Sequence, residues 1–282
     1  MEVILAKSAG FCFGVKRAVD SVYEKAEEGK NIYTFGPIIH NEQVVGDLAK
    51  KGVLVVNSIE ELAKIKEGTI VIRSHGVSKS VYDTIAATGL SLVDATCPFV
   101  KKIHKIVEER SLKGDRIIVI GNRNHPEVCG IVGWVQGDVD VVENVDEAVE
   151  LELEKDRKIS IVSQTTFNLN KFQELVEIFQ KKGYYVSVVN TICNATEERQ
   201  KEASQIAAKV DAMIVIGGAG SSNTQKLYEI CKRECKNTQY IQTLDDLVFD
   251  STESIKSVGI TAGASTPKKI IQEVQNYVRI NF

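Results

Sequence analysis

The sequence predicts an α/β protein built from three repeated α/β units with mainly parallel sheets. Twelve short runs rich in β-branched residues alternate with stretches that carry apolar residues at helical spacing. This alternation is typical of parallel sheets covered by helices. Three cysteines recur at matched places among these runs, and a glycine follows each of them by 24 residues. Equal spacings of this kind indicate an internal triplication.

Each repeat begins at a cysteine that follows a strand and precedes a helix. The order within a repeat is cysteine, helix, strand, glycine loop, helix, strand, helix, strand and polar loop. The cysteine and glycine that mark each repeat are Cys12 with Gly36, Cys97 with Gly121, and Cys193 with Gly217. Pro98 marks the first turn of the helix after the second cysteine.

The polar loops that end the three repeats read SHG, QTT and GAS. The first strand, EVILA, matches the strands that close the first and second repeats, so residues 1–13 are expected to pack with the third. The predicted units therefore cover residues 14–96, 97–192 and 193–282, the last with 1–13 packing onto it. We expect a pseudo-threefold axis, with the carboxyl ends of the strands turned toward one central site.

Composition excludes several classes of protein. The 282 residues are 43% hydrophobic and 26% charged, with a formal net charge of -3, so a broad nucleic-acid surface is not expected. No apolar run is long enough for a signal peptide or a membrane span. The expectation is a cytoplasmic enzyme that holds any anionic ligand locally, with no nucleic-acid or membrane partner.

The three repeated cysteines are candidate metal ligands. Their wide spacing differs from the close pairs of a zinc ribbon. Three converging thiolates instead suit an iron–sulfur cluster with one iron left without a protein ligand. The alternative is that each is a buried apolar cysteine. Cys129, Cys231 and Cys235 fall outside the repeat pattern and are interpreted as structural.

A second group of polar residues at strand ends is typical of an anion site. The run GGAGSSN offers backbone N–H groups and hydroxyls at a helix start, and histidines in other strand-end loops can add donors. Glu127 is a candidate proton donor, because a carboxyl group near an anionic cluster and a phosphate has a raised pKa. His104, on a helix flank, is interpreted as an ordinary packed residue. The candidate phosphate ligands and hydroxyl donors are His40, His75, His125, Ser221, Ser222, Asn223, Thr165, Thr166 and Ser265.

These residues lie in motifs that together resemble the 4-hydroxy-3-methylbut-2-enyl diphosphate reductase family over nearly the whole chain. The resemblance implies three α/β units around a [4Fe-4S] cluster. It also implies reductive removal of the allylic hydroxyl to give isopentenyl and dimethylallyl diphosphates. A small ferredoxin or flavodoxin is implied as the electron donor. The motifs are AGFCFGVKRAV, GPIIHNEQVV, SHGV, DATCPFV, NHPEVCG, SQTT, TICNAT, GSSN and TAGAS.

The resemblance also implies a role for each candidate. Cys12, Cys97 and Cys193 hold the cluster, whose remaining iron binds the substrate hydroxyl. Glu127 is the proton source, with Thr165 beside the substrate hydroxyl. Gln164 and Thr196 are implied as neighbours of the site. The diphosphate is bound by His40, His75, His125, Ser221, Ser222, Asn223 and Ser265, and His125 also joins the proton relay.

Two other functions remain open on the residues alone. One is another triplicated three-cysteine enzyme, such as a quinolinate synthase-like dehydratase, with the same open iron acting on a different acid. The other is a nonenzymatic protein that binds or senses a phosphate ligand.

Overall fold

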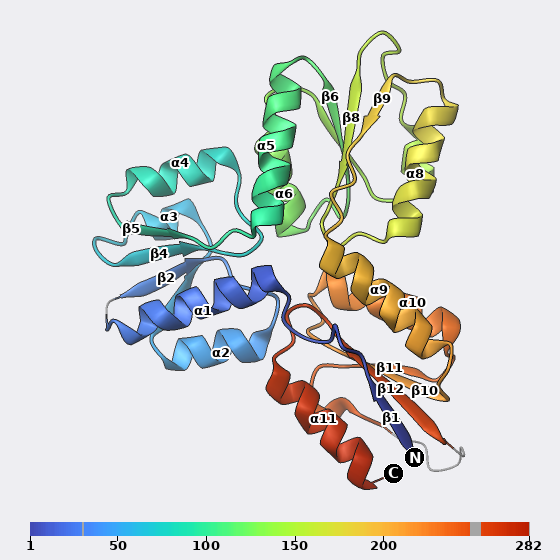
Figure 1. Cartoon of the computed structure of the whole chain (residues 1–282). Helices are drawn as coiled ribbons and strands as arrows, with labels where there is room; N and C mark the ends of the chain where they lie inside the picture. The colour runs from blue at the N-terminus through green and yellow to red at the C-terminus, as the bar shows by residue number, and fades with distance from the viewer. Residues whose placement is uncertain (30, 249–254, 282) are drawn as a thin grey trace. The chain divides into compact units, whose positions relative to one another are not determined.

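The computed structural model describes residues 1–29, 31–248 and 255–281. In these ranges the chain forms three four-stranded sheets, and every paired strand runs parallel to its neighbour (Figure 1). Each of the twelve β-branched runs contains one strand. The predicted class, three α/β units with parallel sheets, is therefore confirmed.

The chain divides into two compact units. The terminal unit comprises residues 1–16, 39–47 and 194–282, and the middle unit comprises residues 17–38 and 48–193. One sheet belongs to the terminal unit and two belong to the middle unit. The predicted boundaries of the repeats stay a prediction, and residue 282, the end of the third, lies outside the described residues.

The first sheet of the middle unit has the strand order β3-β2-β4-β5. Its central strand β4 is buried along its whole length, because helices cover both faces of a parallel sheet. The strands are β2 (Ile32–Phe35), β3 (Val53–Val56), β4 (Thr69–Ile72) and β5 (Ser91–Asp94). The helices that alternate with them along the chain are α1 (Phe13–Glu27), α2 (Glu42–Lys50), α3 (Ile59–Leu62) and α4 (Lys79–Ala87).

The second sheet of the middle unit has the order β7-β6-β8-β9. Its strands are β6 (Arg116–Ile120), β7 (Val139–Val142), β8 (Ile159–Ser163) and β9 (Val186–Val188). Its helices are α5 (Pro98–Leu112), α6 (Pro126–Val132), α7 (Val145–Glu150) and α8 (Leu169–Lys181). Successive residues of β6 point to opposite faces: Ile118 packs with Phe172 of α8, and Ile117 packs with Ile103 of α5. Helices α5 and α8 accordingly lie on opposite sides of this sheet (Figure 1).

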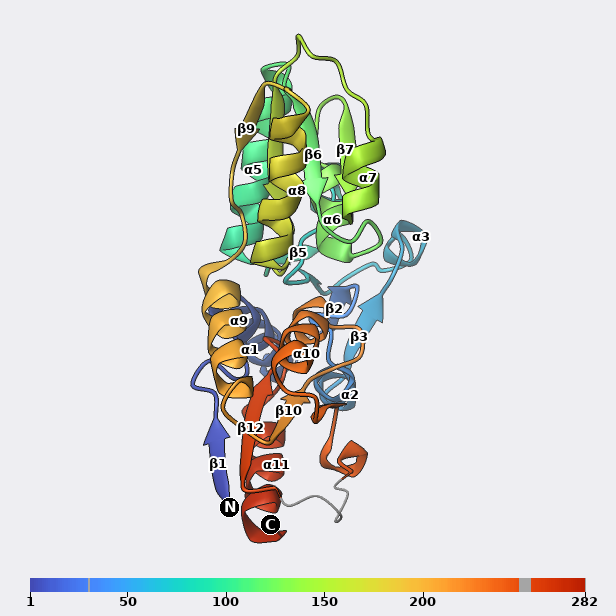
Figure 2. The same cartoon turned by 90° about the vertical axis from the view of Figure 1, so that its right-hand side faces the viewer.

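The sheet of the terminal unit has the order β1-β12-β10-β11. Its strands are β1 (Glu2–Leu5), β10 (Ala212–Ile216), β11 (Thr238–Ile241) and β12 (Ser257–Ala262). Helix α11 (Lys268–Asn281) covers one face, and α9 (Asn194–Ala207) and α10 (Ser222–Glu234) cover the other (Figure 2). A 3-10 turn, η1 (Leu244–Asp246), follows β11. The N-terminal strand pairs with β12, with Glu2 opposite Ser257.

The three sheets repeat the same strand order at the level of single hydrogen bonds. In each sheet, the N–H of the repeat glycine donates to the carbonyl at the end of the neighbouring edge strand. The three bonds are Gly36 to Val56 (2.7 Å), Gly121 to Val142 (3.1 Å) and Gly217 to Ile241 (2.9 Å). The glycine spacing read from the sequence therefore marks one structural position, where strand ends and loop begins.

Among the described residues, no helix is both long enough and apolar enough to cross a membrane.

Candidate functional site

The three repeat cysteines lie where a closing strand leads into a helix. Cys12 directly precedes α1, Cys97 precedes α5 and Cys193 precedes α9. All three are half-buried, and none of the six cysteines, all of which lie in the described ranges, forms a disulfide.

Each repeat cysteine is joined to a polar loop by a backbone hydrogen bond. The cysteine N–H donates to a carbonyl in the loop that follows the neighbouring strand. The three bonds are Cys12 to Ala264 (3.3 Å), Cys97 to Ser74 (2.9 Å) and Cys193 to Thr165 (3.0 Å). In every repeat, therefore, the candidate metal ligand and the candidate substrate loop are held side by side.

The chemistry of these three residues fits an iron–sulfur cluster. Their thiols form no disulfide, are partly accessible and lie at helix starts, where the helix dipole favours an anionic cluster. The other cysteines differ. Cys231 and Cys235 are buried in the core of the terminal unit, and burial raises the pKa of Cys231 to about 12. The exposed thiol of Cys129 donates to the carbonyl of Arg123 at 3.3 Å.

Glu127 is the most deeply buried carboxyl group in this region, with 3% of its surface exposed. The amide of Thr165 donates to its Oε1 at 2.6 Å, and the Thr165 hydroxyl donates to its Oε2 at 2.7 Å. Desolvation raises the pKa of Glu127, and the two hydrogen bonds from Thr165 act in the opposite direction. A carboxyl group with a raised pKa can hold and deliver a proton near neutral pH.

His125 is the N-cap residue of α6. Its Nδ1 accepts a hydrogen bond from the N–H of Glu127 at 3.1 Å, so a neutral ring carries its proton on Nε2. Pro126 occupies the first turn, where its missing N–H costs nothing. The sequence His-Pro-Glu thus fixes both the tautomer of the histidine and the entry of Glu127 into the helix.

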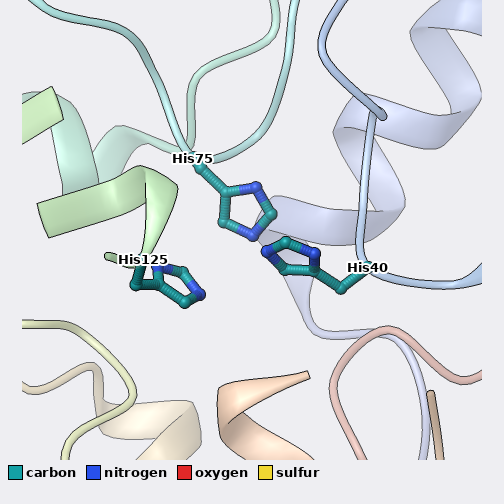
Figure 3. A group of neighbouring side chains, drawn as sticks. All are labelled: His40, His75 and His125. Carbon is teal, nitrogen blue, oxygen red and sulfur yellow. The ribbon is translucent and has the colours of Figure 1, made fainter. Parts of the chain in front are cut away.

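His75 lies beside His125 in the middle unit. Their ring centroids are 5.3 Å apart and the ring planes are nearly perpendicular. Figure 3 shows the two side chains next to each other. His75 follows Ser74, whose carbonyl accepts from Cys97, and Glu127 contacts Thr165, whose carbonyl accepts from Cys193. The middle unit therefore brings Cys97, His75, His125, Glu127, Thr165 and Cys193 into one connected set.

The terminal unit holds the other candidates around the start of α10. The Ser265 hydroxyl donates to the carbonyl of His40 at 3.2 Å and lies 3.5 Å from the Ser221 hydroxyl. Ser221 caps α10 through the N–H of Thr224, and Ser222 is the first residue of the helix. Because a helix start favours anions, this loop can bind a phosphate group.

The side-chain amide of Asn223 has a buried donor with no protein acceptor among the described residues. Its Oδ1 accepts from the N–H of Ala264 at 3.0 Å, whereas its Nδ2 is buried and meets no hydrogen-bond acceptor in the part of the chain that the structure describes. The residue is 4% exposed, so an unmet donor there is costly. Phosphate oxygens are suitable acceptors for it.

Gly218 is required by the same loop. A Cβ at this position would lie 2.8 Å from the carbonyl oxygen of His40. That distance is shorter than any side chain tolerates, so only glycine lets the two backbone segments approach. Gly218 of GGAGSSN therefore allows the loop that carries His40 to lie against the loop that carries Ser221.

Gln164 and Thr196 are both buried. Gln164 accepts from the N–H of Asn122 at 3.2 Å, which supports the loop before His125. Thr196 lies in the first turn of α9, and Thr166 follows Thr165 in its loop. All three residues are next or close to candidate residues in sequence, and Gln164 also supports the backbone of a site loop.

Two residues that hold the Cys12 loop were not singled out from the sequence. Arg199 donates from Nε and Nη2 to the carbonyl of Ser8 at 2.9 and 2.6 Å, and from Nη2 to that of Gly10 at 2.7 Å. Glu202 accepts from the backbone N–H groups of Lys7 and Ser8 and from the Ser8 hydroxyl. Both lie in the charged run TEERQKE of α9. Their hydrogen-bond partners are in a loop that is far away in sequence, so the run itself does not indicate these contacts.

Comparisons with known proteins cover nearly the whole chain. Residues 3–279 match a family model described as LytB protein. A protein of Thermoanaerobacter sp. (strain X514), named 4-hydroxy-3-methylbut-2-enyl diphosphate reductase, is 47% identical over 99% of this chain and 97% of its own length. A protein of the same name from Clostridioides difficile (strain 630) is 42% identical over 99% of each chain.

Two solved structures are similar as well. One is the E-1-hydroxy-2-methyl-but-2-enyl-4-diphosphate reductase of Plasmodium falciparum, with a TM-score of 0.92 and 29% identity over 98% of this chain and 87% of that chain. The other is described as (E)-4-hydroxy-3-methyl-but-2-enyl diphosphate reductase, the terminal enzyme of the non-mevalonate pathway. It has a TM-score of 0.71 and 41% identity over 99% of each chain.

Proposed function

This chain belongs to the LytB protein family, and we propose that it is an oxidoreductase that reduces 4-hydroxy-3-methylbut-2-enyl diphosphate. The reaction takes two electrons and two protons, breaks the allylic carbon–oxygen bond, and releases water with isopentenyl or dimethylallyl diphosphate. The full-length identity of 42% to 47% to relatives that carry the name of this reductase is the observation on which the proposal rests.

The terminal unit contributes the larger set of diphosphate ligands. His40, Ser221 and Ser265 lie together there, Ser222 starts a helix, and Asn223 presents a buried donor. The middle unit contributes His75 and His125, with Nε2–H of His125 as donor. In this proposal helix ends and hydrogen-bond donors bind the diphosphate. Such a site needs no strongly basic surface, which agrees with a chain of net charge -3.

Glu127 supplies the proton in this proposal. Burial keeps its carboxyl protonated nearer neutral pH than an exposed glutamate, and Thr165 fixes the orientation of both of its oxygens. The departing hydroxyl leaves as water once it accepts that proton. In this proposal Thr165 lies beside the substrate hydroxyl, and His125, two residues before Glu127, joins the proton relay.

Cys12, Cys97 and Cys193 hold a [4Fe-4S] cluster in this proposal. When bound, the cluster supplies single electrons and a Lewis-acidic iron with no protein ligand. The electrons come from a small ferredoxin or flavodoxin, and the enzyme works in the cytoplasm. The three thiols form no disulfide and are partly accessible, which supports their role as ligands.

Anaerobic reconstitution followed by turnover tests the proposal. We expect broad absorbance near about 400 nm, as iron–sulfur chromophores generally give. We also expect consumption of the allylic diphosphate with a chemical reductant. A colourless, iron-free protein after reconstitution would exclude the cluster. Absorbance without turnover of this substrate would favour a dehydratase acting on another acid. Substrate binding that survives Cys97→Ser without any redox activity would favour a phosphate sensor.

A further inference from the structure

His104 lies in α5 at a contact between two parts of the proposed site in the middle unit. Its side chain is 5% exposed. A Cβ at Gly76 would be 2.7 Å from its Cε1, and a Cβ at Gly130 would be 3.5 Å from its Nε2. The imidazole edge therefore fits against two glycines, one next to His75 and one in α6, the helix that begins after His125.

Trp134 completes this contact. Its indole stacks on the His104 ring, with centroids 5.2 Å apart and planes 14° from parallel. Its Nε1–H donates to the carbonyl of Val77 at 2.9 Å, and Lys79 Nζ lies 4.9 Å from the indole centroid. The N–H of Lys79 also donates to the carbonyl of Gly133. Two hydrogen bonds, at Val77 and at Lys79, thus hold the segment after His75 against the end of α6.

The separation of His75 and His125 depends on this packing. A Cβ at Gly130 would lie 3.7 Å from the carbonyl oxygen of His75, so α6 rests almost directly on the His75 backbone. His125 caps the other end of the same helix. A wider or narrower group than imidazole at residue 104 would shift one segment against the other, and with it the two histidine rings.

We propose that His104 is a positioning residue for diphosphate binding, which sets the spacing of His75 and His125 through Gly76 and Gly130. The inference rests on the proposed function, because it assigns His104 to the site that binds the substrate diphosphate. His104 does not touch the substrate; it acts through the two segments on which it packs.

The chemistry of His104 agrees with a neutral spacer. Its Nε2 is buried and has no hydrogen-bond partner among the described residues. Burial lowers the pKa of His104 to about 4; Asp94 opposes this shift and Lys101 adds to it. The ring is therefore uncharged at neutral pH, so it fills the space as a flat aromatic group without adding charge beside the two histidine ligands.

A neighbouring pocket allows a direct test. The pocket has a volume of about 270 Å³, and its lining includes His104, Trp134, Tyr82 and Lys101. His104→Ala opens a cavity next to this pocket, so added imidazole can enter and replace the missing ring. Loss of positioning is then reversible, whereas a general loss of folding is not.

The test compares holoenzyme variants by kinetics and by calorimetric titration with inorganic pyrophosphate. For His104→Ala we expect the KM and the pyrophosphate Kd to rise about tenfold, the scale of one weakened hydrogen bond to a charged group, with kcat within about threefold. Imidazole should restore both constants in the variant and leave the wild type unchanged. Iron content should match that of the wild type.

Val107→Ala is the matched control. Val107 lies one turn further along α5, is fully buried and packs in the core of the same sheet. Its truncation destabilises the core, and Val107 is not among the atoms nearest to Gly76 or Gly130. We expect unchanged KM and Kd for this variant. If His104→Ala does not fold, His104→Asn takes its place, with a smaller increase expected.

Two results would overturn the inference: unchanged constants in a folded His104 variant, or an equal increase in Val107→Ala. Failure of the proposed function would be recognised separately, because the wild type itself would then not turn over the allylic diphosphate. In that case the pyrophosphate affinities of the variants would still decide the role of His104.

Discussion

The backbone N–H and the hydroxyl of Thr165 donate to the two oxygens of one buried carboxyl group, that of Glu127. The same threonine accepts the N–H of Cys193 on its carbonyl. The proposed proton donor and one proposed metal ligand are thereby held by a single residue. Changes at Thr165 and Glu127 should consequently affect the chemical step more than substrate binding.

Replacing Glu127 by glutamine should reduce kcat by roughly a hundredfold or more, the usual contribution of a positioned proton donor. Diphosphate affinity should remain near the wild-type value, because Glu127 is assigned no contact with the diphosphate. Steady-state kinetics and pyrophosphate titration measure the two effects. An equal loss of affinity and rate would instead make Glu127 a structural residue.

The activity of the wild type should fall as pH rises through the pKa of Glu127, because the acid form donates the proton. That pKa is raised by burial, so the fall should come at a higher pH than for an exposed glutamate. The profile of kcat/KM against pH reports the free enzyme. A profile that is flat across this limb in the wild type would contradict the assignment.

Thr165→Val and Thr165→Ser form a matched pair. The valine variant loses the hydroxyl bond to Glu127, one of the contacts that lower the carboxyl pKa. The alkaline limb of its pH profile, where activity falls, should therefore move to higher pH. Its rate should fall by about tenfold, the scale of one charge-assisted hydrogen bond. The serine variant keeps the hydroxyl and should leave the limb in place. A shift of the limb in both variants would point to altered packing.

Asn223→Ala should raise the KM about tenfold and leave kcat within about threefold, because the buried Nδ2 is assigned to the diphosphate. Asn223→Asp keeps the acceptor for the N–H of Ala264 but replaces the donor by a negative charge, so binding should weaken further. Titration with inorganic pyrophosphate separates the two variants. Unchanged affinity in Asn223→Ala would remove this residue from the phosphate site.

Cys12→Ser, Cys97→Ser and Cys193→Ser should each lose most bound iron after anaerobic reconstitution. Cys129→Ser should keep it, because the Cys129 thiol is exposed and bonded to the carbonyl of Arg123. Iron analysis and absorbance measure both. Full iron content in any of the first three variants would exclude that cysteine as a ligand.

The buried ring of His104 should make the protein less stable at low pH. Its folded pKa of about 4 lies below the ordinary 6.5, so the unfolded chain binds more protons between these values. Stability is complete above pH 6.5 and falls toward pH 4, by about 3 kcal/mol for this group. Denaturant unfolding, followed by the fluorescence of Trp134, should show a smaller fall for His104→Asn.

The fold was predictable because its signals are local and repeated. β-branched runs identified the twelve strands in the described ranges, and the spacing from Cys97 to Gly121 recurs twice more. The repeat glycine and the candidate thiol ligand both follow strands, so one spacing reported two structural positions. Parallel pairing followed from the helices between strands.

The predictability of the site was uneven for a physical reason. Residues whose chemistry is visible in their type, such as Glu127 and Cys97, could be selected from sequence. Residues that act through distant backbone could not. Arg199 matters because it contacts the carbonyls of Ser8 and Gly10, and nothing in its own neighbourhood indicates that partner. His104 was interpreted as ordinary packing, since its glycine and indole contacts come from other elements.

The backbone bond between each repeat cysteine and its polar loop leaves the loop side chains free for other uses. Main-chain atoms make the bond, so no particular side chain is needed for it. The acceptor and the residue after it are Ser74 and His75 in one repeat, Thr165 and Thr166 in the next, and Ala264 and Ser265 in the third. One backbone frame can thus offer an imidazole or a hydroxyl at the same place beside each cysteine, so three similar units can present different groups to one asymmetric molecule.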